Sequence, residues 1–253
     1  IAVDSDGTLY VTDRFNCTIR TITPVGTNWV VHTIAGTVAD PYGGFEDGIN
    51  QDAQFYWPFG IARHDGGNLY VADYGNNAIR RISPQGPDWV TSTVAGFSGG
   101  SGSEDGSARK AAFNSPNGIA VEASETLYVA DQFNYTIRKL VPDGKSWVVS
   151  TVGGLALTPG TNDGVGVSAR FYRPWGIALD RTGNLYVADS FNNTIRRGML
   201  LSASPPALQI VLAAGQVILS WPTTASNYVL ETTSALGEEA SWVVKTNGIT
   251  ITG

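Results

Sequence analysis

The sequence is poor in charge, cysteine and histidine. Only 15% of its 253 residues are Asp, Glu, Lys or Arg, whereas an average globular protein has about 25%. The formal net charge is −6 and only four residues are Lys, which disfavours nucleic acid or an anionic membrane as a partner. The single Cys excludes an internal disulfide and a Cys-rich zinc site. Two His, at positions 32 and 64, exclude a metal centre built on three histidines.

Long apolar runs are also lacking. None approaches the roughly 20 residues of a membrane-spanning helix, so we expect no membrane span. No stretch has the pattern of a signal peptide, and the first residue is Ile rather than Met. We therefore expect the sequence to be a fragment or a processed piece of a longer protein.

Turn-forming and aromatic residues are abundant. The chain has 30 Gly and 12 Pro, together with 10 Tyr, 9 Phe and 7 Trp, and 42% of its residues are hydrophobic. This composition supplies a core and argues against disorder. It is typical of a protein built from short strands joined by turns.

Four copies of Leu-Tyr-Val-x-Asp recur at spacings of 60, 58 and 58 residues, beginning at Leu9, Leu69, Leu127 and Leu185. Each copy is followed by Asn-x-Thr/Ala-Ile-Arg, and the first three are followed next by Pro-x-Gly-x-x-Trp-Val. The last three copies are preceded by Pro-x-Gly-Ile-Ala. Counted back from Leu9, the Gly of this motif would fall just before Ile1, so the chain is expected to begin inside a repeat.

Each repeat predicts four β-strands. In the second repeat they span residues 60–63, 68–73, 78–83 and 89–94. The joins between them are so short that neighbouring strands must be antiparallel. Repeats of four such strands are the mark of a β-propeller, so we predict an all-β fold with four visible blades.

The motifs Pro-x-Gly-Ile-Ala, Asn-Leu-Tyr-Val-Ala-Asp and Asn-Asn-Thr-Ile-Arg resemble the NHL-repeat family over residues 1 to about 197. This resemblance implies a propeller, commonly with six blades. The repeats here are longer than is usual in that family, with the excess in loops 37–59, 97–117 and 155–175. The fourth repeat lacks its last hairpin, and we expect an absent N-terminal part to complete the ring.

The chain after the repeats has a different character. We assign residues 1–199 to propeller blades, 200–206 to a linker and 207–253 to a partial β-sandwich with five strand-like runs. The last segment resembles the immunoglobulin- or fibronectin-like modules that end some secreted bacterial proteins. That resemblance implies an extracellular or cell-surface location.

Two kinds of charged residue repeat in frame and are interpreted as structural. The aspartates end a strand and begin a tight turn, where a carboxylate can accept backbone N–H groups. The arginines are expected to make hydrogen bonds between blades. The alternatives are a metal site for the aspartates and an anionic ligand for the arginines. These residues are Asp13, Asp73, Asp131 and Asp189, and Arg20, Arg80, Arg138 and Arg196.

The candidate ligand site lies where the repeat varies. The residue before each strand-opening Gly is Phe59, Asn117 or Trp175, and the blade geometry does not dictate this choice. Aromatic rings, Arg and Asn are suited to ligand binding. We predict a shallow aromatic site on these three residues, flanked by Trp57, Tyr172 and Arg173. The alternative is that the rings merely pack between loops.

Two functions fit these features. The first is a non-enzymatic binding module that presents loops to a protein, peptide or glycan. The second is a metal-dependent enzyme like the lactonases and lyases built on six-bladed propellers, with its site partly in absent blades. We favour binding, and the visible sequence offers no catalytic residue, no metal ligands and no cofactor site. His64 is interpreted as a solvated turn residue.

Overall fold

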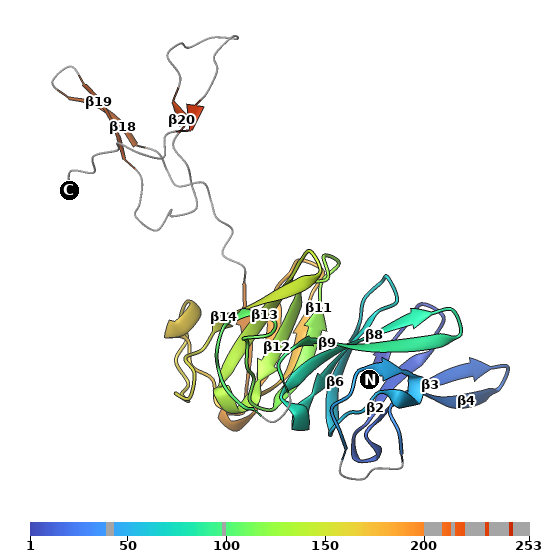
Figure 1. Ribbon diagram of the computed structural model, residues 1–253. Coiled ribbons are helices and arrows are strands. Elements are labelled where there is room, and N and C mark those ends of the chain that lie inside the picture. Colours follow the sequence, from blue (N-terminus) through green and yellow to red (C-terminus); the bar gives the residue numbers. More distant parts are fainter. Residues whose placement is uncertain are drawn as a thin grey trace. The chain divides into compact units, whose positions relative to one another are not determined.

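A computed structural model describes residues 1–38, 43–97 and 100–199, together with four short strands beyond residue 208. Over the first three ranges the chain forms four consecutive antiparallel sheets, one for each sequence repeat (Figure 1). The predicted all-β fold and its propeller arrangement are confirmed. The helices in the described part of the chain are 3₁₀ turns of three residues each.

The four sheets are the blades of the propeller, numbered along the chain. Blade 1 contains β1 (Ala2–Val3), β2 (Leu9–Asp13), β3 (Thr18–Val25) and β4 (Asn28–Ala35). Blade 2 contains β6 (Pro58–Arg63), β7 (Leu69–Asp73), β8 (Ala78–Gln85) and β9 (Asp88–Ala95), with β5 (Gly48–Ile49) beside β9. Blade 3 contains β11 (Pro116–Val121), β12 (Leu127–Asp131), β13 (Thr136–Asp143) and β14 (Ser146–Gly153), with β10 (Gly106–Ser107) beside β14. Blade 4 contains β15 (Pro174–Leu179), β16 (Leu185–Asp189) and β17 (Thr194–Gly198).

The 3₁₀ turns occupy two recurring places. Four of them follow the strand that ends in Asp: η1 (Arg14–Asn16), η3 (Tyr74–Asn76), η4 (Gln132–Asn134) and η6 (Ser190–Asn192). Two others lie in the long loops: η2 (Asn50–Asp52) and η5 (Gly166–Ser168). Each of the first four ends at a residue in the left-handed region, with φ near 54–60°.

The long loops differ from expectation because they contribute strands. Two residues of each of the first two loops, β5 and β10, pair with the outermost strand of the blade that follows, making five-stranded sheets. A two-residue pairing has no alternation that a sequence pattern could reveal. The loops are therefore part of their blades rather than free connections.

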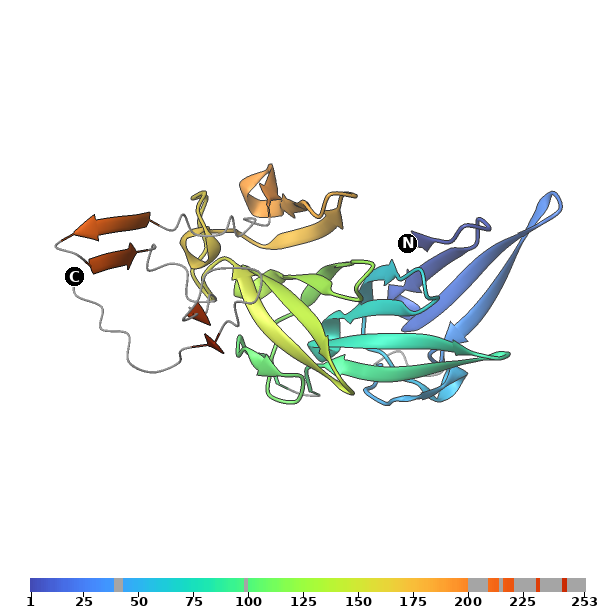
Figure 2. The same cartoon turned by 90° about the horizontal axis from the view of Figure 1, so that it is seen from above.

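The core lies between the blades rather than within them. Three clusters of buried side chains each combine residues from two consecutive blades. Successive strand residues point to opposite faces, so Tyr70 joins the cluster with blade 3 while Leu69 and Val71 join the cluster with blade 1. Figure 2 shows the blades from above as consecutive twisted sheets.

The inner strands β6, β11 and β15 lie side by side. A Cβ atom at Gly60 would overlap the carbonyl oxygen of Asn117, and one at Gly118 would overlap that of Trp175. Only Gly permits two backbones to approach this closely. This contact explains why Gly recurs in the Pro-x-Gly-Ile-Ala motif.

The chain divides into two compact units, Ile1–Leu200 and Leu201–Gly253. In the second unit, β18 (Gln209–Ala213) pairs antiparallel with β19 (Gln216–Ser220), and β20 (Glu231–Thr232) with β21 (Val243–Val244). The predicted linker 200–206 and the last of the five predicted strand-like runs, residues 249–252, fall outside the described residues. The partial β-sandwich stays a prediction.

Candidate functional site

The repeated aspartate fastens a loop to its blade. The Oδ1 atom of Asp73 accepts the backbone N–H of Tyr56 at 2.8 Å, and its Oδ2 atom accepts Asn76 Nδ2 at 2.8 Å and Arg80 Nη1 at 2.9 Å. Asp131 and Asp189 make the same three bonds in blades 3 and 4. Each aspartate therefore ties the strand end to the loop that leads into the inner strand.

The repeated arginine extends this network. Besides Asp73, Arg80 donates to the carbonyl oxygens of Gln54 and Glu46, at 2.8 and 2.6 Å, and to Asp47 at 2.8 Å. All these partners lie in the loop of its own repeat, so the expected bonds between blades are replaced by bonds within one repeat. The reason is that the long loop folds back along the blade far enough to reach the guanidinium.

Burial and the neighbouring arginine act in opposite directions on the pKa of these aspartates. Loss of hydration raises the pKa of Asp73 and of Asp131 to about 6, although the neighbouring guanidinium and the hydrogen bonds lower it. The geometry shows that each aspartate forms an ion pair with its arginine, at 2.9 Å for Asp73 with Arg80 and 2.7 Å for Asp131 with Arg138. The two residues are fully buried together and have no route to a ligand.

The loops that lead into β6, β11 and β15 meet the 3₁₀ turns on one side of the propeller. The backbone N–H groups of Gly75, Phe133 and Phe191 donate to loop carbonyl oxygens at 2.7–3.1 Å. We call this side, with the turns η1, η3, η4 and η6 and these loops, the turn face. The predicted ligand-site residues all belong to its loops or to the strand ends beside them.

Phe59 and Trp175 meet on the turn face. Their ring centroids are 5.6 Å apart, with the rings tilted by 65°, an edge-to-face arrangement that aromatic pairs favour. They come from blades 2 and 4, so the contact joins segments 116 residues apart in the sequence. Trp175 keeps 40% of its surface exposed.

Arg14 completes a cluster around this pair. Its guanidinium carbon lies 4.9 Å from the ring centroid of Phe59, 5.4 Å from that of Tyr74 and 5.5 Å from that of Trp57. These are distances at which a cation is attracted to a ring face. We call Arg14, Trp57, Phe59, Tyr74 and Trp175 the aromatic cluster.

The two remaining flanking residues form a separate group. Tyr172 lies against the rings of Tyr135 and Phe191, with centroids 5.7 and 5.2 Å away. The guanidinium carbon of Arg173 lies 4.8 Å from the ring centroid of Phe133 and 4.4 Å from that of Phe191. The structure shows no ring contact between this group and the aromatic cluster in the described part of the chain.

Asn117 lies in the interior rather than on a shallow surface. It is 1% exposed, and its Nδ2 atom donates to Gln132 Oε1 at 3.4 Å. Its Oδ1 atom is buried and has no hydrogen-bond partner among the described residues. The packing of the inner strands covers this position, so Asn117 is a poor candidate for the first contact with a ligand.

The structure adds residues that the sequence analysis overlooked. Arg14 and Tyr74 occupy the first position of their 3₁₀ turns, and Phe133 and Phe191 the second. The first position varies between repeats as strongly as the residue before the inner Gly does, because it reads Arg14, Tyr74, Gln132, Ser190; the second is Phe in three repeats and Gly75 in the other. Comparing repeats at the turns would have found them.

Two arginines on the turn face lack an acidic partner. Arg20, Arg80, Arg138 and Arg196 each pair with an aspartate. Arg14 and Arg173 form no ion pair with any described residue, and the Nε atom of each is buried without a hydrogen-bond partner. The turn face therefore carries positive charge that the described chain leaves uncompensated.

Three of the positions concerned have unusual backbone conformations. Trp57, Ser115 and Arg173 occupy the same place in their repeats, and all have φ near +54°. Gly or Asn would adopt this left-handed conformation at lower cost.

No described group of three His, Cys, Asp or Glu residues could hold a metal ion. No described helix is long and apolar enough to span a membrane.

Comparison with known families matches the NHL repeat to residues 55–82 and 171–197, in blades 2 and 4. The human NHL repeat-containing protein 2 is 32% identical over 136 residues, which cover 51% of this chain and 18% of that protein. Protein SUPPRESSOR OF QUENCHING 1, chloroplastic, from Arabidopsis thaliana is 29% identical over 167 residues, covering 60% of this chain and 15% of its own length. This chain thus spans less than a fifth of the length of either relative.

Solved structures share the fold. An auxiliary nutrient binding protein from Bacteroides ovatus superposes with a TM-score of 0.59 at 23% identity, covering 78% of this chain and 46% of that one. A protein of the same description from Bacteroides thetaiotaomicron gives a TM-score of 0.58 at 22% identity, covering 76% and 45%. At this identity the likeness supports the propeller fold alone.

Proposed function

We propose that this NHL propeller is a non-enzymatic interaction scaffold whose turn face binds a segment of a partner protein. The observation that carries the proposal is Arg14, a cation without a carboxylate partner in the described chain, held among the rings of Trp57, Phe59 and Tyr74. Such a group would bind a carboxylate through charge-assisted hydrogen bonds while the rings cover apolar atoms of the ligand.

The remaining features of the turn face favour the same ligand. Trp175 lies beside Phe59 and is partly exposed, so it extends the aromatic surface away from Arg14. Arg173 adds a second cation without a described carboxylate partner on the same face, over the rings of Phe133 and Phe191. An acidic, aromatic peptide segment is therefore the ligand class that we favour over a glycan at this surface. The proposed setting is the cell surface or the extracellular space, on the character of the C-terminal segment.

The test uses defined peptides. An array of synthetic 12-residue peptides should include Glu-rich, Lys-rich and uncharged sequences, each with and without one Trp. We expect the wild-type chain to prefer Glu-rich peptides that contain Trp. The best peptide is then titrated against the variants Arg14→Ala and Trp175→Ala. We expect each substitution to weaken binding about tenfold or more, while the melting temperature changes by a few degrees at most.

Arg181→Ala is the matched control. Arg181 is an exposed arginine in the turn between β15 and β16, at the end of the blade opposite the 3₁₀ turns, and its removal changes the net charge by the same amount. Its variant should bind the peptide as the wild type does. If Arg14→Ala bound the peptide as tightly as the wild type, the proposal would be contradicted. A large loss of stability in Trp175→Ala would also contradict it, because the ring would then belong to the core.

A further inference from the structure

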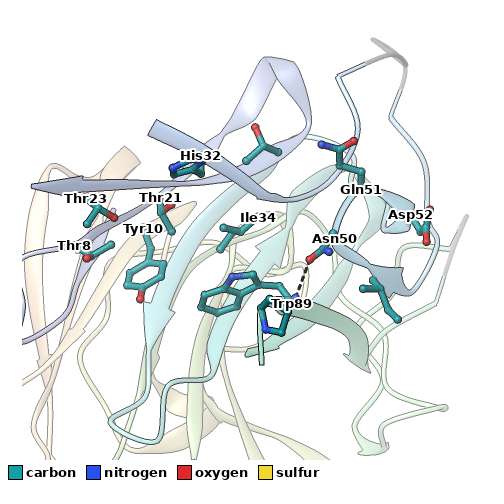
Figure 3. Close-up of a pocket in the computed structure, with 13 residues that line it drawn as sticks. Thr8, Tyr10, Thr21, Thr23, His32, Ile34, Asn50, Gln51, Asp52 and Trp89 are labelled. Carbon is teal, nitrogen blue, oxygen red and sulfur yellow. Dashed lines mark hydrogen bonds between the residues drawn. The ribbon is translucent and has the colours of Figure 1, made fainter. Parts of the chain in front are cut away.

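A polar cavity, separate from the turn face, lies between blades 1 and 2. It has a volume of about 780 Å³, within the range of small-molecule sites. Figure 3 shows Tyr10, Thr21 and His32 along one wall, with Asn50 and Trp89 facing them. The first three are neighbours across β2, β3 and β4, since Tyr10 pairs with Thr21 and Thr21 with His32. The second wall comes from η2 and β9.

The blades on either side of this cavity are no further apart than the next pair. The ring centroids of Tyr10 and Trp89 are 6.0 Å apart, and the equivalent rings between blades 2 and 3, Tyr70 and Trp147, are 5.9 Å apart. Both pairs are edge-to-face. The cavity therefore does not arise from a wider gap between the sheets.

One change in the repeat lies at the centre of this cavity. The residue after each repeated arginine is Thr21, Arg81, Lys139 or Arg197. Arg81 pairs with Tyr70 in the sheet and its Nε atom is buried, and the Lys139 ammonium lies 5.9 Å from the ring centroid of Tyr128. A long basic side chain thus lies beside the tyrosine in blades 2 and 3. Thr21 is several atoms shorter and leaves the space above Tyr10 open.

The lining of this space is rich in hydroxyl groups. Thr8, Thr21, Thr23 and Thr33 all contribute, and none of their hydroxyls hydrogen-bonds another described residue. The 13 lining residues include neither Lys nor Arg, and Asp52 is the acidic residue among them. Asn50 is held in place, because its Oδ1 atom accepts the backbone N–H of Trp89 and its Nδ2 atom donates to Asp88, each at 2.8 Å.

This chemistry matches a neutral sugar better than a charged ligand. A pyranose offers hydroxyl groups that both donate and accept hydrogen bonds, which threonine hydroxyls and amides can satisfy. Its apolar C–H face packs on rings such as Tyr10 and Trp89. An anionic ligand would find no cationic group of Lys or Arg in the lining, and a purely apolar one would leave the polar groups without water.

We propose that the cavity between blades 1 and 2 is a binding site for a neutral saccharide, separate from the turn face and independent of its ligand. The probes are cellohexaose, xylohexaose, mannohexaose and maltohexaose, each titrated into the 253-residue chain by calorimetry and by Trp fluorescence. We expect at least one of the four to bind the wild type with a dissociation constant below about 10 mM, which is weak binding. Failure of all four at that concentration would overturn the proposal.

Thr21→Arg provides the decisive variant, since it restores the residue found at Arg81. We expect it to weaken saccharide binding at least about tenfold by filling the space, whereas Thr21→Ser, which keeps the hydroxyl, should change binding less than about threefold. Gln51→Arg, on the exposed opposite wall, gives a second means of obstruction if Thr21→Arg does not fold. Trp175→Ala should bind the saccharide normally. If the folded variant, Thr21→Arg or Gln51→Arg, bound the saccharide as tightly as the wild type, the proposal would be contradicted.

Discussion

At the residue scale, the repeat separates side chains that hold the fold from those that are free for function. The aspartates and arginines that recur in every repeat form buried networks in blades 2 and 3, as their regular recurrence predicts. The varying positions supply Arg14, Trp57 and Phe59, which meet on the turn face. Asn117 varies as well but is buried, because variation alone does not reveal which position a neighbouring strand covers.

The Asp–Arg pair has a different energetic weight in each blade. Asp73 and Arg80 have no exposed side-chain surface, whereas Asp13 and Arg20 in blade 1 keep 26% and 39% exposed. Asp73→Asn should lower the free energy of unfolding by about 3–5 kcal/mol, because Arg80 is left as a buried charge without a carboxylate. Asp13→Asn, the matched control, should cost about 1 kcal/mol or less, because water screens the pair.

Urea unfolding followed by circular dichroism measures both values, provided that each transition has the same slope as the wild type. Equal losses for the two variants would mean that burial does not set the strength of this pair.

At the element scale, His64 changes the hydrogen-bond partner of the strand tyrosine in blade 2 from a residue of its own blade to a residue of the next blade. In blades 1, 3 and 4 the strand tyrosine donates its hydroxyl to an acidic residue of its own repeat: Asp4, Glu122 or Asp180. His64 occupies this place in blade 2, so Tyr70 donates instead to Glu125 of blade 3, at 2.9 Å.

His64 is therefore not the solvated turn residue expected from the sequence. Its Nε2 atom lies 3.1 Å from the carbonyl oxygen of Ala123, and its Nδ1 atom lies 3.7 Å from Glu125. The sequence could not show this, because the contact depends on how two blades stack.

Glu125 makes the stability of this interface depend on pH. Burial raises the pKa of its carboxyl, but hydrogen bonds from Asn68 and Tyr70 and the nearby charges of His64 and Arg81 outweigh that effect, so the pKa lies below its usual range. A lowered pKa means that the carboxylate stabilises the folded state at pH values above the unfolded pKa of about 4.3. This contribution is lost as the pH falls below that value through the folded-state pKa.

The variant Glu125→Gln should thus be less stable than the wild type at pH 7, by about 1–3 kcal/mol for hydrogen bonds to a charged group. The difference between the two proteins should shrink as the pH falls below about 4.3. Thermal unfolding at pH 7 and at several acidic pH values checks the sign. A difference that grows on acidification would refute this account. Glu104→Gln is the matched control, because its side chain is exposed and shows no bond that stabilises the blade interface.

At the scale of the whole molecule, the repeat predicts the blades, their order and the antiparallel pairing, because short joins leave few alternatives. It does not predict β5 and β10, which depend on a loop folding back onto its own blade. Nor does it predict the cavity between blades 1 and 2, which depends on how a side chain fills a space between two sheets. The repeat therefore predicts what the blades share, whereas both proposed binding sites depend on positions where one repeat differs from the others, such as Arg14 and Thr21.

The last departure concerns the outer face of blade 4. The Ile of Asn-x-Thr-Ile-Arg is fully buried at Ile19 and Ile79 and nearly so at Ile137, but Ile195 is 71% exposed. Tyr186 on the neighbouring strand is also exposed, whereas its equivalents in the other blades are buried. Burying an isoleucine side chain contributes about 1.5–3 kcal/mol, so this face has a strong tendency to pack against another surface.

In a solution of the 253-residue chain, the same face of a second copy offers an apolar surface to it. We therefore expect self-association that increases with concentration, because an uncovered sheet face or edge readily pairs with another chain. Ile195→Lys should shift the population toward monomer without lowering the melting temperature, because the replaced side chain is exposed in the folded chain. Val165→Lys, which places the same charge on an exposed loop residue, should leave the association unchanged. Sedimentation velocity over a hundredfold concentration range distinguishes these outcomes, and a wild-type chain that stays monomeric throughout would show that the bare face of blade 4 does not drive association.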